Sequence, residues 1–259
     1  MAELSPMMKQ YFETKKKYPD TILMFRLGDF YEMFFDDAVT ASRELELVLT
    51  GRACGQEERA PMCGVPFHSA DSYMARGLVA KGYKVAICEQ MEDPALAKGL
   101  VKREVVRVLT PGTVIENSML NEGRNNFLAS VYFAGESAGV CFIDVSTGSV
   151  NLTELAAPAL PDKIINEIGR FMPSEIVFNS ASSSLTKVFS FISNKTEALA
   201  QELGDDYFDP QSSAEIILKH FKKDSLSELE LNETGAAGPA PSGTRSGAQI
   251  SHRSSAQRS

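Results

Sequence analysis

Hydrophobic residues in the first hundred positions recur at two spacings, one typical of helices and the other of buried strands. Between Ser5 and Pro19, apolar residues return every three or four positions, which predicts a helix. Ser5 is suited to cap this helix with Pro6 in its first turn, and Pro19 limits its length. The run 21–28, TILMFRLG, is short and mostly apolar, so it predicts a buried strand that ends at Gly28.

Apolar spacing predicts two further helices in this region. The first follows Asp29, and its apolar face is formed by Phe34, Ala38, Ala41 and Leu45. The second begins at Ser69 or Asp71 and stops at Gly82. Further strands are predicted over residues 47–50, 83–89 and 103–110. Strands that alternate with helices indicate a layered α/β structure.

After residue 126 the pattern changes to short apolar strands separated by glycine-containing turns. The predicted strands are 127–133, 139–145 and 148–155, and their close succession favours an antiparallel meander. A helix over 161–172, a strand over 175–179 and a later helix over 214–221 follow. A meander followed by a helix and a further strand predicts an RNase H-like layout.

Charge divides the chain into three parts. Residues 1–116 carry 15 Lys and Arg against 17 Asp and Glu, and residues 117–234 carry 8 against 17. The acidic middle part is a poor partner for a polyanion, whereas the first part allows a local basic face. Residues 235–259 carry three arginines and no acid. Their Ser-, Gly- and Pro-rich composition cannot bury enough apolar area to offset ordering, so we expect this tail to be disordered.

The bulk composition is that of an ordinary globular protein. Of 259 residues, 43% are hydrophobic and 23% are charged, and no apolar run is long enough to cross a bilayer. The charged N-terminus lacks the apolar core of a signal peptide, which favours a cytoplasmic location. Four cysteines without paired spacing are expected to be reduced and mostly buried. A zinc site from Cys54, Cys63 and His68 is the weaker alternative, because the spacing is not ligand-like.

The segment 28–38, GDFYEMFFDDA, combines aromatic rings with carboxylates. In one interpretation Asp29 and Glu32 cap the following helix and Phe30 packs in the core. In the other, Phe30 projects outward at the strand-to-helix turn with Glu32 beside it. An exposed ring there is suited to insert between bases, while the acid accepts a hydrogen bond from a base edge. The residues alone leave both interpretations open.

Several motifs resemble the MutS family of DNA mismatch repair proteins. They are GDFYEMFFDDA preceded by MFRL, then APMCGVPFHSADSY, KVAICEQMEDP, KGLVKREVVRVLTPGT and GVCFIDVSTG. The resemblance covers residues 5 to 235 in order. It implies a mixed-sheet mismatch-recognition domain over 1–116, an RNase H-like connector domain over 117–234 and a disordered tail over 235–259.

The resemblance also implies a site for double-stranded DNA that carries mispairs or small loops. It maps the wedge phenylalanine of the family onto Phe30 and its partner acid onto Glu32. Contacts that position the duplex map onto Arg52, Met62 and Arg103. We expect Arg103 and Arg107 to share one strand face, where both would meet phosphates. A solvated sheet edge is the alternative for these arginines.

Family members place an ATPase, a clamp and a lever after the connector, and they dimerise around the duplex. This sequence has no G-x-x-x-x-G-K-[ST], so we expect neither ATP nor magnesium to bind it and no enzyme activity. We expect the chain alone to be monomeric and to bind DNA feebly, and its connector to contact a MutL-like repair factor. Its Ser- and Arg-rich ending departs from the family and is expected to come from a truncated or misread reading frame.

Two other function classes stay open. An RNase H-like domain can be a metal-dependent nuclease, which needs several carboxylates that converge on metal ions. The candidates are Asp144, Asp162, Glu167 and Glu175. A turn-forming role for Asp144, ahead of Ser146, is the favoured interpretation. The other class, a protein-interaction module, is compatible with mismatch recognition.

Overall fold

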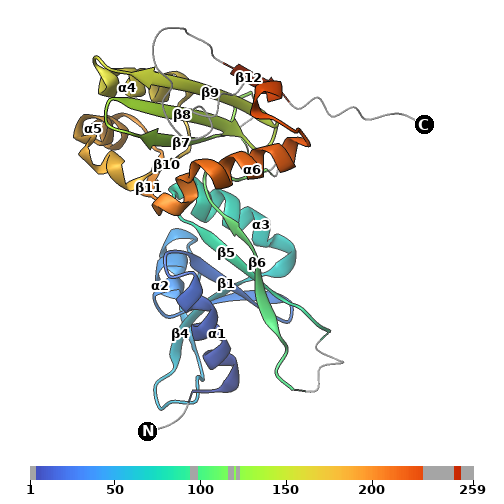
Figure 1. Cartoon of the computed structure of the whole chain (residues 1–259). Helices are drawn as coiled ribbons and strands as arrows, with labels where there is room; N and C mark the ends of the chain where they lie inside the picture. Colours follow the sequence, from blue (N-terminus) through green and yellow to red (C-terminus); the bar gives the residue numbers. More distant parts are fainter. Residues whose placement is uncertain (1–3, 94–98, 116–119, 121–122, 230–247, 252–259) are drawn as a thin grey trace. The chain divides into compact units, whose positions relative to one another are not determined.

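The computed structural model describes residues 4–93, 99–115, 120, 123–229 and 248–251 (Figure 1). The chain forms two compact units. Unit 1 comprises Met1–Pro111 and Asn117–Met119, and unit 2 comprises Gly112–Glu116 and Leu120–Ser259. Each unit is built on its own six-stranded mixed sheet, so the predicted α/β class is confirmed.

The sheet of unit 1 has the strand order β3-β4-β2-β1-β5-β6. Its strands are β1 (Ile22–Leu27), β2 (Phe30–Phe34), β3 (Thr50–Arg52), β4 (Ala60–Pro66), β5 (Val85–Gln90) and β6 (Arg103–Leu109). Strands β1 and β5 are parallel, and the other neighbouring pairs are antiparallel. The central strand β1 is buried along most of its length, which explains its mostly apolar sequence.

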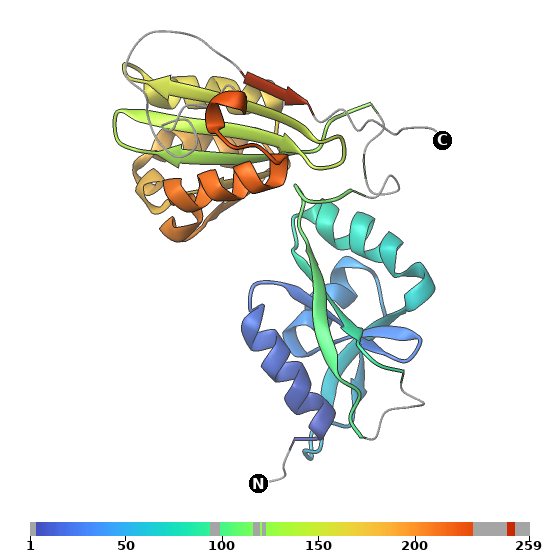
Figure 2. The same cartoon turned by 45° about the vertical axis from the view of Figure 1, so that its right-hand side comes forward.

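Helices cover both faces of this sheet. Helix α1 (Pro6–Lys17) packs on one face through Met8 and Tyr11, and the backbone N–H of Met8 donates to the Ser5 hydroxyl, as the sequence predicted. Helix α2 (Phe35–Glu44) lies on the other face, together with the helical segment 67–81. That segment consists of η1 (Phe67–Ser69), α3 (Ala70–Ser72), η2 (Tyr73–Leu78) and η3 (Val79–Lys81). Figure 2 shows α1 and this segment on opposite sides of the sheet.

The expected helix directly after Asp29 is wrong in its first turn. Residues 30–34 form strand β2, and α2 begins only at Phe35. Tyr31 and Met33 are buried on one face of the strand, while Phe30 and Glu32 are more exposed on the other. This alternation has the period of two that a strand requires. The predicted strand over 47–50 likewise begins only at Thr50, and β4 was not predicted.

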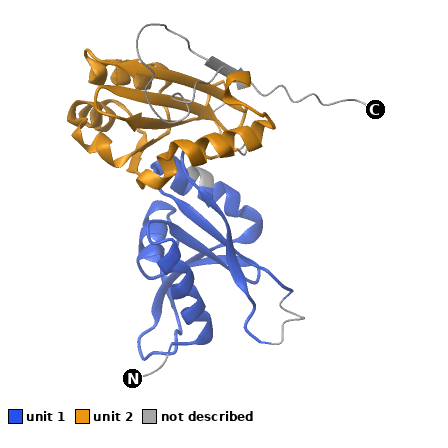
Figure 3. Cartoon of the chain, viewed as in Figure 1, with its two compact units in different colours: residues 1–111, 117–119 blue, residues 112–116, 120–259 orange. Residues whose placement is uncertain are grey.

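The sheet of unit 2 has the order β11-β10-β7-β8-β9-β12, and strands β7 to β11 are orange in Figure 3. Its strands are β7 (Phe127–Phe133), β8 (Ser137–Asp144), β9 (Ser149–Ala156), β10 (Glu175–Phe178), β11 (Leu199–Glu202) and β12 (Ala248–Ser251). Strands β7, β8 and β9 form the predicted antiparallel meander. Strand β10 then adds in parallel beside β7, and β11 in parallel beside β10. This is the RNase H-like layout that the sequence predicted.

Three helices accompany this sheet: α4 (Leu160–Phe171), α5 (Thr186–Lys195) and α6 (Pro210–Phe221). Helices α4 and α5 pack on one face through Ile164, Ile168, Val188 and Ile192. The turn η5 (Asp205–Phe208) precedes α6, and the ring of Phe208 stacks on Tyr132 at a centroid distance of 5.9 Å. Helix α5 and strand β11 were not predicted. Among the residues that the structure describes, no helix is both long and apolar enough to span a membrane.

The tail was expected to be disordered from residue 235 to the end. Residues 248–251 instead form β12, which pairs antiparallel with β9. The open edge of β9 offers the backbone groups for this pairing. The other residues of the predicted tail lie outside the described part of the chain.

Candidate nucleic-acid interface

The hairpin of β1 and β2 forms the centre of the candidate site. Leu27 pairs with Phe30, so only Gly28 and Asp29 make the turn. Gly28 has a φ of 60°, at the position that glycine takes in type II′ hairpin turns. The backbone N–H of Phe67 also donates to the Asp29 carbonyl at 2.8 Å. The turn is thus short and tied to a neighbouring segment.

Phe30 is the first residue of β2, and 46% of its surface is exposed. Among the described residues, no aromatic ring stacks on it. The next aromatic, Tyr31, points to the opposite face of the sheet and is buried. Phe30 therefore presents an apolar ring to solvent from a firmly paired strand, as the second interpretation of the segment requires.

Glu32 and Arg52 form an ion pair across strand β4. Gly64 lies on β4 directly opposite Glu32, whereas Arg52 pairs with Ala60 further along the same strand. A Cβ atom at Gly64 would lie 3.1 Å from the Tyr31 carbonyl oxygen and 3.4 Å from Glu32 Cγ. The absence of a side chain at Gly64 therefore leaves room for the side chain of Glu32. The side chain of Glu32 is 14% exposed and that of Arg52 is 38% exposed, so the arginine is the more accessible partner.

Met62 and Arg103 are less accessible than the resemblance led us to expect. Met62 lies opposite Phe34 in β4 and packs against the core of unit 1. Arg103 is 9% exposed, and its guanidinium donates to the Arg26 carbonyl at 2.7 Å and to Gln10 Oε1 at 3.0 Å. Burial lowers the pKa of this guanidinium. Arg103 thus ties β6 to β1 and α1.

Arg103 and Arg107 do not share one face of β6, so that expectation is wrong. Arg103 pairs with Gln90, and Arg107 pairs with Ile87. The register shifts by one residue between Ile87 and Cys88, as at a β-bulge. Such an extra residue reverses the alternation of side chains along the bulged strand. The two arginines therefore point to opposite faces of the sheet.

The sheet register places all five predicted site residues on the same face. Phe30 and Glu32 alternate along β2, and their neighbours in the adjacent strands bring Arg52, Met62 and Arg103 to that face. The ring of Tyr11 on α1 packs against Phe25 and Phe34, so α1 covers part of this face. Phe30 and Arg52 remain accessible beyond the covered part.

Comparison with known proteins decides the family. The family model of MutS domain I matches residues 5–118, and that of MutS domain II matches residues 126–242. The chain belongs to the MutS family. The DNA mismatch repair protein MutS of Ruminiclostridium cellulolyticum is 50% identical over 240 residues, which are 91% of this chain and 27% of that protein.

Two further MutS relatives show the same extent of similarity. The DNA mismatch repair protein MutS of Acetivibrio thermocellus is 50% identical over 91% of this chain and 28% of its own length. That of Caldanaerobacter subterraneus subsp. tengcongensis is 49% identical over 89% of this chain and 26% of its own length. The chain therefore spans about a quarter of the length of the curated MutS relatives that it matches.

The cysteines of the MutS domain I region do not form the alternative zinc site. Cys54 and Cys63 are buried in the core, on opposite faces of the sheet, whereas His68 is exposed. The Cys63 thiol donates to the Ala38 carbonyl at 3.4 Å, and burial raises its pKa to about 11. A metal ligand must be a thiolate, which such burial disfavours. Among the described residues, no group of three or more potential ligands gathers.

The acids that a nuclease would need in the MutS domain II region serve separate structural roles. Asp144 is buried, and its Oδ1 accepts from the Ser146 backbone N–H at 2.9 Å and from the Ser146 hydroxyl at 2.6 Å. This is the turn-forming role that the sequence favoured. Asp162 forms an ion pair with Lys187, and Glu175 accepts from the Gly112 N–H at 3.0 Å. The described acids do not converge on one metal position.

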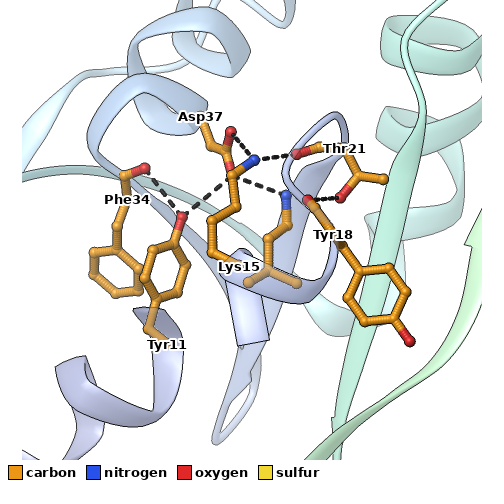
Figure 4. A network of polar contacts seen from close by, with 7 residues as sticks. Tyr11, Lys15, Tyr18, Thr21, Phe34 and Asp37 are labelled. Carbon is orange, nitrogen blue, oxygen red and sulfur yellow. Dashed lines mark hydrogen bonds and ion pairs between the residues drawn. The ribbon is translucent and has the colours of Figure 1, made fainter. Parts of the chain in front are cut away.

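Sequence reasoning missed the buried carboxylate Asp37. It lies in the first turn of α2 and accepts from Lys15 Nζ at 2.8 Å, from the Tyr11 hydroxyl at 3.2 Å and from the backbone N–H of Leu23 at 3.0 Å. Lys15 also donates to the Thr21 carbonyl (Figure 4). The sequence does not distinguish Asp37 from its neighbour Asp36, because both are acids in the first turn of the same helix. Only the structure shows that Asp37 is buried and that Asp36 is exposed.

Proposed function

We propose that this chain binds mismatched double-stranded DNA as the mismatch-sensing part of a MutS protein. In this proposal Phe30 inserts into the duplex at the mispair, and Glu32 accepts a hydrogen bond from a base. The observation that carries the proposal is the exposed ring of Phe30 beside the hairpin turn, with Glu32 on the same face of the strand. Family membership supports the choice of mismatched DNA as the ligand.

The energetics of insertion account for the preference for a mispair. Pushing an apolar ring between base pairs costs a few kcal/mol of unstacking and kinks the duplex. At a mispair part of the pairing is already lost, so opening the step costs less. Stacking on the ring then contributes about 1–3 kcal/mol and accepts any base. Phe30 therefore supplies binding energy for many kinds of mispair.

The ion pair with Arg52 lets Glu32 work close to phosphates. A lone carboxylate would be repelled by the duplex, whereas a carboxylate held by a guanidinium carries little net charge toward it. A carboxylate has more acceptor positions than one arginine occupies, so Glu32 keeps capacity for a base donor. We therefore assign selectivity to Glu32 and charge compensation to Arg52.

The chain offers a direct optical test of insertion, because it contains no tryptophan. In the Phe30→Trp variant, the introduced indole is the only one in the chain and reports on its own surroundings. We expect its fluorescence to be quenched by stacking in a heteroduplex with one mispair and to change much less in the matched homoduplex. We also expect Phe30→Ala to lose about 1–3 kcal/mol of heteroduplex binding.

Phe12→Ala is the matched control for this test. Phe12 is also a partly exposed ring of unit 1, but it lies on α1 and packs on Phe35. It should leave the ratio of heteroduplex to homoduplex affinity unchanged, and Glu32→Ala should reduce that ratio. An equal response of the introduced indole to both duplexes, with an unchanged ratio in Phe30→Ala, would contradict the proposed function.

We further propose that unit 2 contacts a MutL-like repair factor, as the family resemblance implies. Residues 117–234 carry 17 acids against 8 bases, so this part is unsuited to DNA and suited to a basic protein surface. Tyr207 and Ile216 support the proposal, because they are 70% and 67% exposed. Each directly follows an acid in the sequence, Asp206 and Glu215 respectively. Large exposed apolar side chains with a charged rim are typical of protein interaction sites.

A further inference from the structure

A compact cluster of side chains lies behind Phe30, on the opposite face of the sheet. Tyr31 and Arg26 face each other across β1 and β2, and Glu89 reaches them from β5. The Tyr31 hydroxyl donates to Glu89 Oε1, and Arg26 Nη1 lies 3.8 Å from Glu89 Oε2. Phe67 completes the group from η1. We call Arg26, Tyr31, Phe67 and Glu89 the hairpin cluster.

The guanidinium of Arg26 links the parts of the hairpin cluster. Its Cζ lies 3.5 Å from the centroid of the Phe67 ring and 5.5 Å from that of Tyr31. A guanidinium over an aromatic face is an attractive cation–π arrangement. Arg26 Nε also donates to the Gly28 carbonyl in the turn itself. One side chain thus contacts the turn, the neighbouring ring and the carboxylate of β5.

Residues of the hairpin cluster form hydrogen bonds with both residues of the turn, Gly28 and Asp29. Arg26 holds Gly28 through a side chain, while Phe67 holds Asp29 through the backbone N–H that donates to its carbonyl. Burial and the bond to Glu89 raise the pKa of the Tyr31 hydroxyl, so it stays a donor at neutral pH. Phe30 follows this turn directly and precedes Tyr31, so its backbone lies between two anchored positions.

We propose that the hairpin cluster positions Phe30, with Tyr31 and Glu89 as the residues that set the direction in which its ring projects. Neither residue reaches DNA in this proposal, because both face away from Phe30 and Glu32. They fix the backbone of β2 before the duplex arrives. A side chain ordered in advance loses less entropy on insertion, which strengthens binding without any added contact.

This inference rests on the proposed function for its consequence in DNA binding, but it has a test without DNA. The introduced indole of Phe30→Trp reports the local order of the hairpin through its fluorescence anisotropy decay and its accessibility to acrylamide. In this background, Tyr31→Phe and Glu89→Gln each weaken the bond between hydroxyl and carboxylate. Loss of a hydrogen bond to a charged group shifts a local equilibrium about tenfold. We therefore expect both variants to increase the local motion of the indole and its quenching by acrylamide.

Tyr11→Phe is the matched control, because it makes the same substitution at another hydrogen bond between a tyrosine and a carboxylate. Tyr11 donates to Asp37 at 3.2 Å in the same unit, but it lies in the core under α1 and away from the turn. It should lower the melting temperature and leave the motion of the introduced indole unchanged. Tyr31→Phe should instead increase the local motion of the introduced indole and lower the melting temperature by less than Tyr11→Phe does.

The possible results separate this inference from the proposed function. The positioning role is wrong if, without DNA, Tyr31→Phe and Glu89→Gln change neither the anisotropy decay of the introduced indole nor its quenching by acrylamide. If they increase the local motion of the introduced indole and also lower the ratio of heteroduplex to homoduplex affinity, both the positioning role and its consequence for DNA binding are supported. If the local motion of the indole increases but Phe30→Trp alone binds heteroduplex and homoduplex equally, the positioning role is supported and the proposed function is wrong.

Discussion

At the scale of single residues, the candidate site combines the exposed ring of Phe30 with the ion pair between Glu32 and Arg52. Arg52 is the more accessible half of the pair, and its guanidinium has more donors than Glu32 engages. It is therefore placed to contact a phosphate while still holding the carboxylate. Phosphate contacts position a protein on the duplex and carry no sequence information.

This role of Arg52 predicts a change in salt dependence. Removing one phosphate contact lowers the slope of log K against log salt by about one unit and weakens binding to all duplexes alike. We expect this result for Arg52→Ala in titrations at several salt concentrations, with a partial effect for Arg52→Lys. Arg43→Ala is the control, because Arg43 is an exposed arginine of α2 on the other side of unit 1. Equal slopes for Arg52→Ala and the unaltered chain would exclude the phosphate contact.

The sequence predicted the accessible position of some candidate residues and not the buried position of others, for a physical reason. Phe30 and Glu32 are close in sequence and on one strand face, so a short motif was enough to select them. The buried position of Arg103 depends on Gln10 and Arg26, which are distant in sequence, and no local pattern encodes those contacts. The same holds for the bond between Tyr31 and Glu89.

At the scale of elements, Asp37 joins α1, β1 and α2. Its carboxylate accepts from Tyr11 and Lys15 on α1 and from the backbone N–H of Leu23 in β1 (Figure 4). Leu23 is buried in β1, beside the strand β2 that carries Phe30. The joint therefore fixes the helix that covers the site-bearing face of the sheet.

This joint predicts a large loss of stability in Asp37→Ala. The substitution leaves a buried N–H unpaired and removes the partner of Lys15, which costs about 2–3 kcal/mol. Urea unfolding monitored by circular dichroism measures the change. Asp36→Ala is the control, since this more exposed neighbour should change stability by about 0.5 kcal/mol or less. Similar losses in both variants would show that general charge, and not the joint, stabilises unit 1.

The pattern of elements was predictable where spacing was unambiguous. The meander of unit 2 and the helix capped by Ser5 carry strong local signals, and both are confirmed. Strand β2 was assigned to a helix because the spacing from Phe34 to Leu45 suits a helix and was extended too far back. The short strands β3 and β11 gain their pairing from neighbours and have little signal of their own.

At the scale of the whole molecule, two units with separate cores differ in charge. The candidate site residues Phe30, Glu32 and Arg52 belong to unit 1, and the excess of acid belongs to unit 2. A duplex carries a dense negative charge, so the acidic unit disfavours extended contact with it. The difference favours a division of partners, with DNA on unit 1 and a protein on unit 2.

This division predicts that the two binding activities can be removed independently. We expect the double variant Tyr207→Ser, Ile216→Ser to weaken binding to purified MutL in surface plasmon resonance, because exposed apolar anchors dominate protein interfaces. The ratio of heteroduplex to homoduplex affinity should stay unchanged in the same variant. Val145→Ser is the control, as Val145 is exposed in the turn after β8. If the double variant binds MutL as the unaltered chain does, this surface is not the MutL contact. If Phe30→Ala by itself abolishes MutL binding, the division of partners between the two units is wrong.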